Sequence, residues 1–219
     1  MERQKKVCIA FLGNALHDSR IVNLTNSLKA DDCKVSVIAF DWFISSDDFF
    51  DENYKIFKLS KTSFSILFYL KFALMLIRQL IFTKADIYFA EDLYSLPFVT
   101  LIANLKGKKV IYNSRELYAF IGGLRDKPFI QWIIKSVESF FIKKVDLVLT
   151  TGEMDSNFIE NFYGIRNTIV VRNIPLYQVP ENKIDFRSMF GIAEEKLIML
   201  YQGVLLNGRG MPQIMRALA

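Results

Sequence analysis

The chain has 219 residues, 52% of which are hydrophobic, including 20 Phe and 9 Tyr. This length and composition provide a substantial core and exclude a globally disordered chain. The formal net charge is +5, and the chain has only two cysteines, which excludes a scaffold built on disulfides.

Short apolar runs alternate with longer helical patterns along the chain. The runs predict strands at Val7–Leu12, Val35–Phe40, Tyr54–Leu59, Asp86–Ala90, Lys109–Asn113, Asp146–Thr150, Thr168–Arg172 and Leu197–Tyr201. The helical patterns cover Ser19–Ala30, Phe64–Phe82, Tyr94–Leu105, Phe129–Lys143 and Met154–Tyr163. Because several of the strands are continuously apolar and alternate with helices, the sequence predicts an α/β fold with a doubly wound, Rossmann-like parallel sheet.

A change of pattern after Arg172 predicts a domain boundary. The stretch NIPLYQVPENKIDF contains Pro175 and Pro180 and has no long periodic pattern, as is typical of a linker. We therefore expect a first domain over residues 1–172, a linker over 173–195, and the first strand, loop and helix of a second Rossmann-like domain over 196–219. Since such a unit normally opens a nucleotide-binding domain, we expect this second domain to be truncated.

Two features bear on membranes. The helix expected from Phe64 is almost long enough to span a bilayer, but Lys71 and Arg78 lie on one side of it. Each would cost about 2.5–3.5 kcal/mol at the bilayer centre, which favours a helix packed on the sheet or lying in the headgroup layer.

Residues 104–145 carry nine Lys or Arg against three acids, which suits an anionic membrane surface, although lysines solvated at helix ends are an alternative. We expect a cytoplasmic protein without a secretory signal and without a nucleic acid partner. We also expect peripheral attachment to the inner face of the membrane through this basic stretch, with the face around Lys71 and Arg78 as a second candidate.

The loop after the first strand offers candidate binding residues, because ligands in open α/β sheets bind outside the carboxyl ends of the strands. Gly13 would let the backbone approach a ligand, and Asp18 or Ser19 can cap the following helix. Arg20 and the N–H groups of that helix would then face an anion. His17 is the only histidine, so a histidine-dependent acid–base step would have to use it or a histidine from elsewhere. The alternatives are a plain turn with an N-cap and a surface or capping role for the histidine.

Charged residues follow the fourth and fifth predicted strands. Glu91 and Asp92 follow one strand, and Arg115 and Glu116 follow the next. They predict a pocket in which carboxylates bind hydroxyl groups and Arg115 binds phosphate, or else salt bridges that hold the loops. The sequence has no Cys/His cluster and no Walker-type loop, so we expect neither a metal nor a cofactor.

Four stretches, in order along the chain, resemble the retaining GT-B glycosyltransferases of family 4, the "glycosyl transferases group 1" type. They are HDSRIVNLTNSLKADDCKVSVIAF from His17, DIYFAEDLYSLP from Asp86, KVIYNSRELY from Lys109 and YQGVLLNGRGMPQIMRAL from Tyr201. The resemblance implies an N-terminal domain that binds the acceptor and a C-terminal domain that binds a nucleotide-diphosphate sugar. It implies acceptor contacts from His17, Asp18, Arg20, Glu91, Asp92, Arg115 and Glu116, and donor diphosphate contacts from Gly13, Gly203, Arg209 and Gly210.

The chain also departs from the family pattern. Val204 stands where many relatives have Arg, and Asn113 and Arg115 replace an Asp and a His. Because Arg cannot act as a general base, no catalytic residue is assigned. A Glu-x7-Glu region for the donor sugar has no counterpart, so we expect this chain alone to be inactive.

The resemblance implies sugar transfer from a nucleotide-diphosphate sugar to a lipid-linked or glycan acceptor, in surface polysaccharide or glycolipid synthesis. The alternatives are a non-catalytic module that binds a membrane or a partner, and a nucleotide-sugar epimerase.

Overall fold

The structure is a computed structural model that describes residues 3–41, 53–60, 65–124, 126–174, 177, 179, 184–203 and 210–218. The chain divides into two compact units, Met1–Ile174 and Pro175–Ala219. The predicted end of the first domain at Arg172 lies close to this division.

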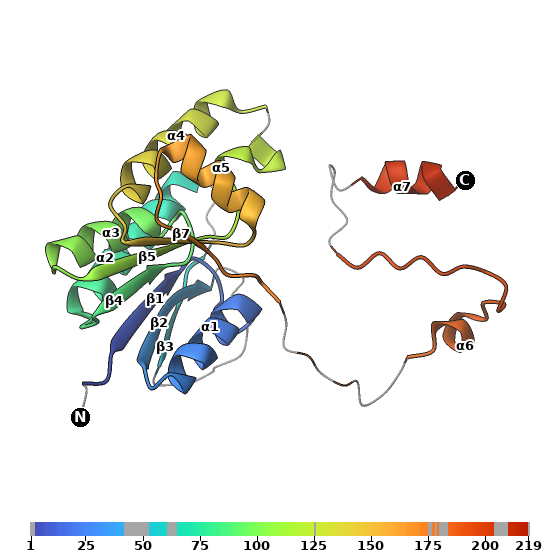
Figure 1. The fold of residues 1–219 in the computed structure, drawn as a ribbon, viewed down its shortest axis with the longest axis horizontal. Helices are drawn as coiled ribbons and strands as arrows, with labels where there is room; N and C mark the ends of the chain where they lie inside the picture. The colour runs from blue at the N-terminus through green and yellow to red at the C-terminus, as the bar shows by residue number, and fades with distance from the viewer. Residues whose placement is uncertain are drawn as a thin grey trace. The chain divides into compact units, whose positions relative to one another are not determined.

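The first unit is built on one parallel sheet (Figure 1). Its strands are β1 (Lys6–Phe11), β2 (Lys34–Asp41), β3 (Tyr54–Lys58), β4 (Ile87–Ala90), β5 (Lys109–Ser114), β6 (Leu147–Thr150) and β7 (Thr168–Val170). They lie in the order β3-β2-β1-β4-β5-β6-β7, and every neighbouring pair is parallel. The register pairs Val7 with both Val35 and Ile87, which places apolar side chains of adjacent strands on the same face. The predicted doubly wound, Rossmann-like sheet is therefore confirmed.

Helices cover both faces of the sheet. They are α1 (Ser19–Ala30), α2 (Ser65–Phe82), α3 (Leu96–Leu105), α4 (Pro128–Ile142) and α5 (Glu153–Tyr163), with short 3₁₀ turns at Tyr118–Phe120 and Gly122–Leu124. Ile21 of α1 joins the core on one face with Val7 and Val37. Residues from α2 to α5 join the core on the other face.

The sequence located these elements closely. All five predicted helices and the first seven predicted strands are present, with ends that differ by a few residues. Phe64, the predicted start of the second helix, lies outside the described residues. The strands could be predicted because side chains buried on both faces give continuous apolar runs in the sequence, as Cys8, Ile9 and Ala10 do in β1.

The eighth predicted strand, Leu197–Tyr201, is not formed. The described part of the second unit contains two helices, α6 (Phe186–Phe190) and α7 (Met211–Leu218), and no strand with which this run could pair. A strand needs backbone hydrogen bonds to a neighbour, so its apolar composition alone does not produce one.

The order of the strands fixes where a ligand can bind. The chain leaves β1 towards β2 and leaves β4 towards β5, so the helices that follow these two central strands lie on opposite faces of the sheet. This divergence opens a crevice at the carboxyl ends of β1 and β4.

The basic stretch at residues 104–145 does not form one charged surface among its described residues. Lys106 Nζ donates hydrogen bonds to the carbonyl oxygens of Leu80 and Thr83, at 2.6 and 2.8 Å. Lys109 pairs with Asp146 at 2.6 Å, at the start of β5. Arg115 follows the opposite end of the same strand and is buried. The charges are therefore distributed over both ends of the sheet, and several of them satisfy internal groups.

Candidate functional site

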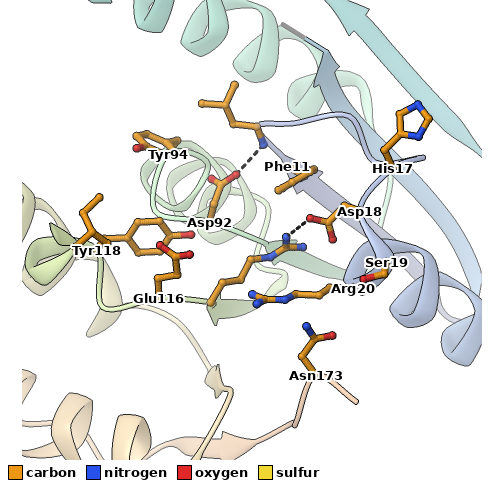
Figure 2. A pocket seen from close by; sticks show the side chains of 13 residues that line it. Phe11, His17, Asp18, Ser19, Arg20, Asp92, Tyr94, Glu116, Tyr118 and Asn173 are labelled. Carbon is orange, nitrogen blue, oxygen red and sulfur yellow. Dashed lines mark hydrogen bonds and ion pairs between the residues drawn. The ribbon is translucent and has the colours of Figure 1, made fainter. Parts of the chain in front are cut away.

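A pocket of about 540 Å³ opens at the carboxyl ends of the central strands, beside the N-terminus of α1 (Figure 2). Its walls are formed by Phe11, Leu12, His17, Asp18, Ser19, Arg20, Asp92, Tyr94, Arg115, Glu116, Tyr118, Ile121 and Asn173. These residues belong to the first unit and lie where the strand order predicts a ligand site.

Asp92 connects two walls of the pocket. Its Oδ2 accepts a hydrogen bond from the backbone N–H of Leu12 at 2.7 Å, and its Oδ1 accepts one from Ser95 N–H at 2.6 Å. Burial raises the pKa of Asp92, and these backbone donors counteract that effect. The carboxylate therefore holds the end of β1 against the start of α3, which differs from the predicted binding of acceptor hydroxyls.

Arg115 is held by two carboxylates. Its Nη1 donates to Asp18 Oδ2 at 2.7 Å, and its Nη2 donates to Glu91 Oε2 at 2.8 Å. The Arg115 side chain is 8% exposed and that of Glu91 is 0% exposed. Burial alone would lower the pKa of Arg115, but the two carboxylates raise it, so the guanidinium is charged and paired.

Glu91 lies behind Arg115 and is not part of the pocket wall. Burial raises the pKa of Glu91, while the adjacent Arg115 favours its charged form. Its Oε2 also accepts a hydrogen bond from Asn113 Nδ2 at 2.9 Å. Glu91 and Arg115 thus form the predicted salt-bridge network, and the guanidinium is not left free for a phosphate.

Asp18 has two structural roles. Its Oδ1 accepts the Ile21 N–H at 3.0 Å and caps α1, as the sequence predicted. Its Oδ2 pairs with Arg115. This single side chain therefore fixes the start of α1 relative to the loop after β5.

Gly13 is buried and does not line the pocket. A Cβ at this position would lie 2.6 Å from the Phe11 ring, so the ring occupies the space that glycine provides. The Arg115 guanidinium also packs on the Phe11 ring, 4.5 Å from the ring centroid. The glycine is therefore explained by packing rather than by the predicted approach of a donor diphosphate.

Arg20 and Glu116 are the charged side chains of the pocket wall that are not held by other groups. No hydrogen bond or ion pair joins either side chain to another residue in the described ranges. Figure 2 shows Arg20 reaching from α1 into the pocket, with Glu116 and Tyr118 on the facing wall. A ligand with both an anionic group and hydroxyl groups would meet complementary partners here.

Two phenols complete this wall. Burial raises the pKa of Tyr94 and of Tyr118, so both side chains stay neutral and can donate a hydrogen bond. His17 lies at the rim, where its side chain is exposed.

The structure brings most of the predicted acceptor residues together at one pocket. His17, Asp18, Arg20, Asp92, Arg115 and Glu116 line it, and Glu91 lies directly behind it. Of the predicted donor residues, Gly203 and Gly210 belong to the second unit, and Arg209 lies outside the described residues.

The pocket is also lined by residues that were not predicted from the sequence, namely Phe11, Tyr94, Tyr118, Ile121 and Asn173. The two tyrosines could have been predicted from the sequence, since each closely follows the end of a predicted strand. Asn173 follows the last strand of the sheet, and its place in the wall depends on the path of the chain after β7.

Among the described residues, no group of three or more His, Cys, Asp or Glu side chains could hold a metal ion. None of the described helices has the combination of length and hydropathy that is needed to cross a bilayer.

Comparison with known proteins identifies the fold. No protein-family model matches the chain, and no curated protein matches its sequence. Among solved structures, it is similar to the lipopolysaccharide outer core galactosyltransferase WaaB in its apo form, with a TM-score of 0.51, 15% identity, and coverage of 82% of this chain and 50% of that one. It is also similar to a UDP-N-acetylglucosamine 2-epimerase, with a TM-score of 0.51, 14% identity, and coverage of 77% of this chain and 48% of that one.

The chain thus spans about half the length of these two proteins. At such low identity the likeness concerns the fold. The first unit has the Rossmann-like, parallel α/β architecture of a GT-B domain.

Proposed function

We propose that the protein is a glycosyltransferase that moves a sugar from a nucleotide-diphosphate sugar to a lipid-linked or glycan acceptor at the inner face of a membrane. The observation that carries this proposal is the pocket at the carboxyl ends of β1 and β4, on whose walls Arg20 and Glu116 have no partner among the described residues. Its position in a fold shared with a galactosyltransferase supports the same conclusion.

In this proposal the pocket binds the acceptor. Arg20, in the first turn of α1, pairs with a phosphate of the acceptor, where the helix N-terminus adds favourable electrostatics. Glu116 accepts hydrogen bonds from sugar hydroxyls, and Tyr94 and Tyr118 provide phenolic donors. Arg115 positions Asp18 and so holds the pocket in shape.

The donor would be held by the second unit. The resemblance of its Gly203, Arg209 and Gly210 to the diphosphate loop of retaining family 4 enzymes supports this assignment. Electrostatic stabilisation of the departing diphosphate by Arg209 and a helix N-terminus would then need no metal ion.

A nucleotide-sugar epimerase is the second candidate, because the similarity to an epimerase is as strong as that to the galactosyltransferase. The two activities differ in their products. A transferase yields a sugar linked to an acceptor and a free nucleotide, whereas an epimerase yields an isomeric nucleotide sugar. The third reading, a module without catalysis, yields neither.

The test uses radiolabelled UDP- and GDP-sugars with a lipid and glycan extract as acceptor. It is run on the full-length protein. We expect label in the acceptor fraction. In the active protein, Arg20→Ala should raise the KM for the acceptor by about 10- to 100-fold, as expected for the loss of a charge-assisted hydrogen bond, with a small effect on kcat.

Lys29→Ala is the matched control, because Lys29 lies in the last turn of the same helix, away from the pocket. An equal rise in KM for both variants would contradict the assignment of the acceptor site. Formation of an isomeric nucleotide sugar without labelled acceptor would replace the transferase with the epimerase.

A further inference from the structure

The solvent-facing sides of α2, α3 and α4 are apolar. On an ordinary surface helix the exposed side is polar, and only the side towards the core is hydrophobic. Here Leu70 and Leu74 of α2 are more than half exposed, as are Leu105 of α3 and Phe129 and Trp132 of α4. We call this combined surface the α2–α4 face.

The α2–α4 face is continuous. Helix α2 packs beside α3, and α3 packs beside α4. All three contribute to the same core, on the side of the sheet opposite to α1 (Figure 1). Several exposed aromatic and aliphatic side chains therefore form one surface, which is larger than the scattered apolar residues of an ordinary soluble protein.

The charge of this face has one sign. Among the described residues, α2 carries Lys71 and Arg78 and no acid, and α3 carries no charge. The one acid of α4, Glu138, is buried and accepts hydrogen bonds from two tyrosines. Exposed apolar side chains and cations without exposed carboxylates are the composition that binds the surface of an anionic bilayer.

A second copy of the chain fits this surface poorly. A two-fold interface on the α2–α4 face would bury Lys71 and Arg78 of both copies, and the described parts of the three helices offer no exposed carboxylate to pair with them. Burying a charge without a partner is unfavourable. Phosphate headgroups, in contrast, provide the missing negative charge.

The α2–α4 face adjoins the pocket. Tyr69 of α2 stacks on Tyr94, which lines the pocket, with ring centroids 5.4 Å apart. At the other side, the segment before α4 contains Tyr118 and Ile121, which both line the pocket. A bilayer against this face would therefore lie beside the entrance of the pocket.

We propose that the α2–α4 face docks on an anionic phospholipid bilayer, with its apolar side chains among the headgroups and acyl chains, and with Lys71 and Arg78 on lipid phosphates. The surface is separate from the pocket wall, so it can be tested without a donor, an acceptor or turnover. Failure of sugar transfer would leave the result unchanged.

The test follows Trp132 fluorescence with vesicles of phosphatidylcholine, with and without phosphatidylglycerol. The chain has two tryptophans, so Trp42→Phe leaves Trp132 as the only reporter. Without vesicles we expect the red-shifted emission of an exposed indole, since Trp132 is 63% exposed. With anionic vesicles we expect a blue shift, weakened by salt because surface charge is screened.

Variants of this reporter protein separate the charged and apolar contributions. Lys71→Gln with Arg78→Gln should weaken binding by about 25-fold, which is about fivefold for each basic residue near an anionic surface. Leu74→Gln should weaken it by about tenfold. The matched control, Lys29→Gln with Lys34→Gln, removes the same charge at α1 and β2 and should change binding by less than about threefold. Circular dichroism checks that each variant is folded.

Three results would overturn the proposal. One is the absence of binding to anionic vesicles. Another is an equal loss of binding in the control pair, which would indicate attraction by net charge alone. The third is blue-shifted Trp132 emission before vesicles are added, because the face would then be covered by protein. Sedimentation velocity on the Leu74→Gln variant identifies a second copy as the cover if the variant dissociates.

Discussion

Arg115 lies where three segments of the pocket meet. It joins Asp18 at the start of α1 to Glu91 after β4, and it covers the Phe11 ring at the end of β1. Replacing it with Met would leave the Glu91 carboxylate buried without its charge partner. We expect Arg115→Met to lower the free energy of unfolding by about 3–5 kcal/mol, measured by urea denaturation.

A second substitution tests whether the unpaired charge of Glu91 causes this loss of stability. Adding Glu91→Gln to Arg115→Met removes the unpaired charge and should recover a large part of the lost stability. Arg172→Met is the control, because Arg172 pairs with Glu153 where both side chains are mostly exposed, and should cost less than about 1 kcal/mol. If Arg115→Met cost no more than the control, the structural role of the Arg115 ion pairs would be contradicted.

Glu138 predicts a pH dependence of stability. Its carboxylate accepts hydrogen bonds from Tyr112 Oη at 2.7 Å and Tyr163 Oη at 2.6 Å inside the core. Burial raises the pKa of Glu138, and the two phenols only partly offset this. The folded protein therefore binds the proton more tightly than the unfolded chain, and the associated stability is present at low pH and lost as pH rises through the raised pKa.

Glu138→Gln removes this titration and retains an acceptor and a donor for the two phenols. We expect the stability of the wild type relative to this variant to fall as the pH rises above the ordinary glutamate range, as measured by urea unfolding at several pH values. A difference that is constant with pH would contradict the prediction. Using the difference between the two proteins cancels the contributions of the other carboxylates.

The sequence could indicate candidate site residues, but it could not indicate which residues they pair with. Glu91, Asp92, Arg115 and Glu116 were identified because each closely follows the end of an apolar run. That Arg115 is paired depends on Asp18, which is 97 positions away in the chain. A local sequence pattern cannot show that residues so far apart in the chain are in contact. For the same reason, the place of Asn173 in the pocket wall could not be predicted.

At the scale of elements, prediction succeeded where local pattern and tertiary environment agree. Gly164 ends α5 with φ of 66°, a left-handed conformation that glycine adopts without strain, and it follows the last residue of the predicted helix. Prediction failed at Leu197–Tyr201, where an apolar run has no strand beside it. A helix can satisfy its own backbone, but a strand depends on a neighbour.

The pattern of α2 shows a further limit at this scale. It is apolar on its buried side, as in Phe72, Leu76 and Leu80, and also apolar on its exposed side, as in Leu70 and Leu74. The sequence therefore did not indicate which side faces the sheet. It indicated that a helix with two cations on one side is packed on the sheet or lies in a headgroup layer. In the structure the buried side packs on the sheet, and in the proposed docking the exposed side contacts lipid headgroups. The two interpretations are therefore compatible.

At the scale of the molecule, the two units differ in how well their residues are packed. The first unit buries a core on each face of its sheet. In the second unit, neither α6 nor α7 contains a buried residue, and Leu197, Met199 and Leu200 are exposed. Segments with few buried contacts open at low free energy, so the second unit should be the more accessible to proteases.

Trypsin tests this difference in packing. Lys196 is exposed and precedes the unpaired run from Leu197, whereas Lys106 is bound to carbonyl oxygens and Arg115 is buried. Since proteases cleave segments that open from the fold, we expect cleavage after Lys196 at least about tenfold faster than after Lys106 or Arg115. Intact-mass spectrometry over a time course identifies the products.

Simultaneous cleavage at all three sites would show that the first unit is no more stable than the second. Strong protection of Lys196 would show that the second unit packs more tightly in solution than its exposed side chains indicate.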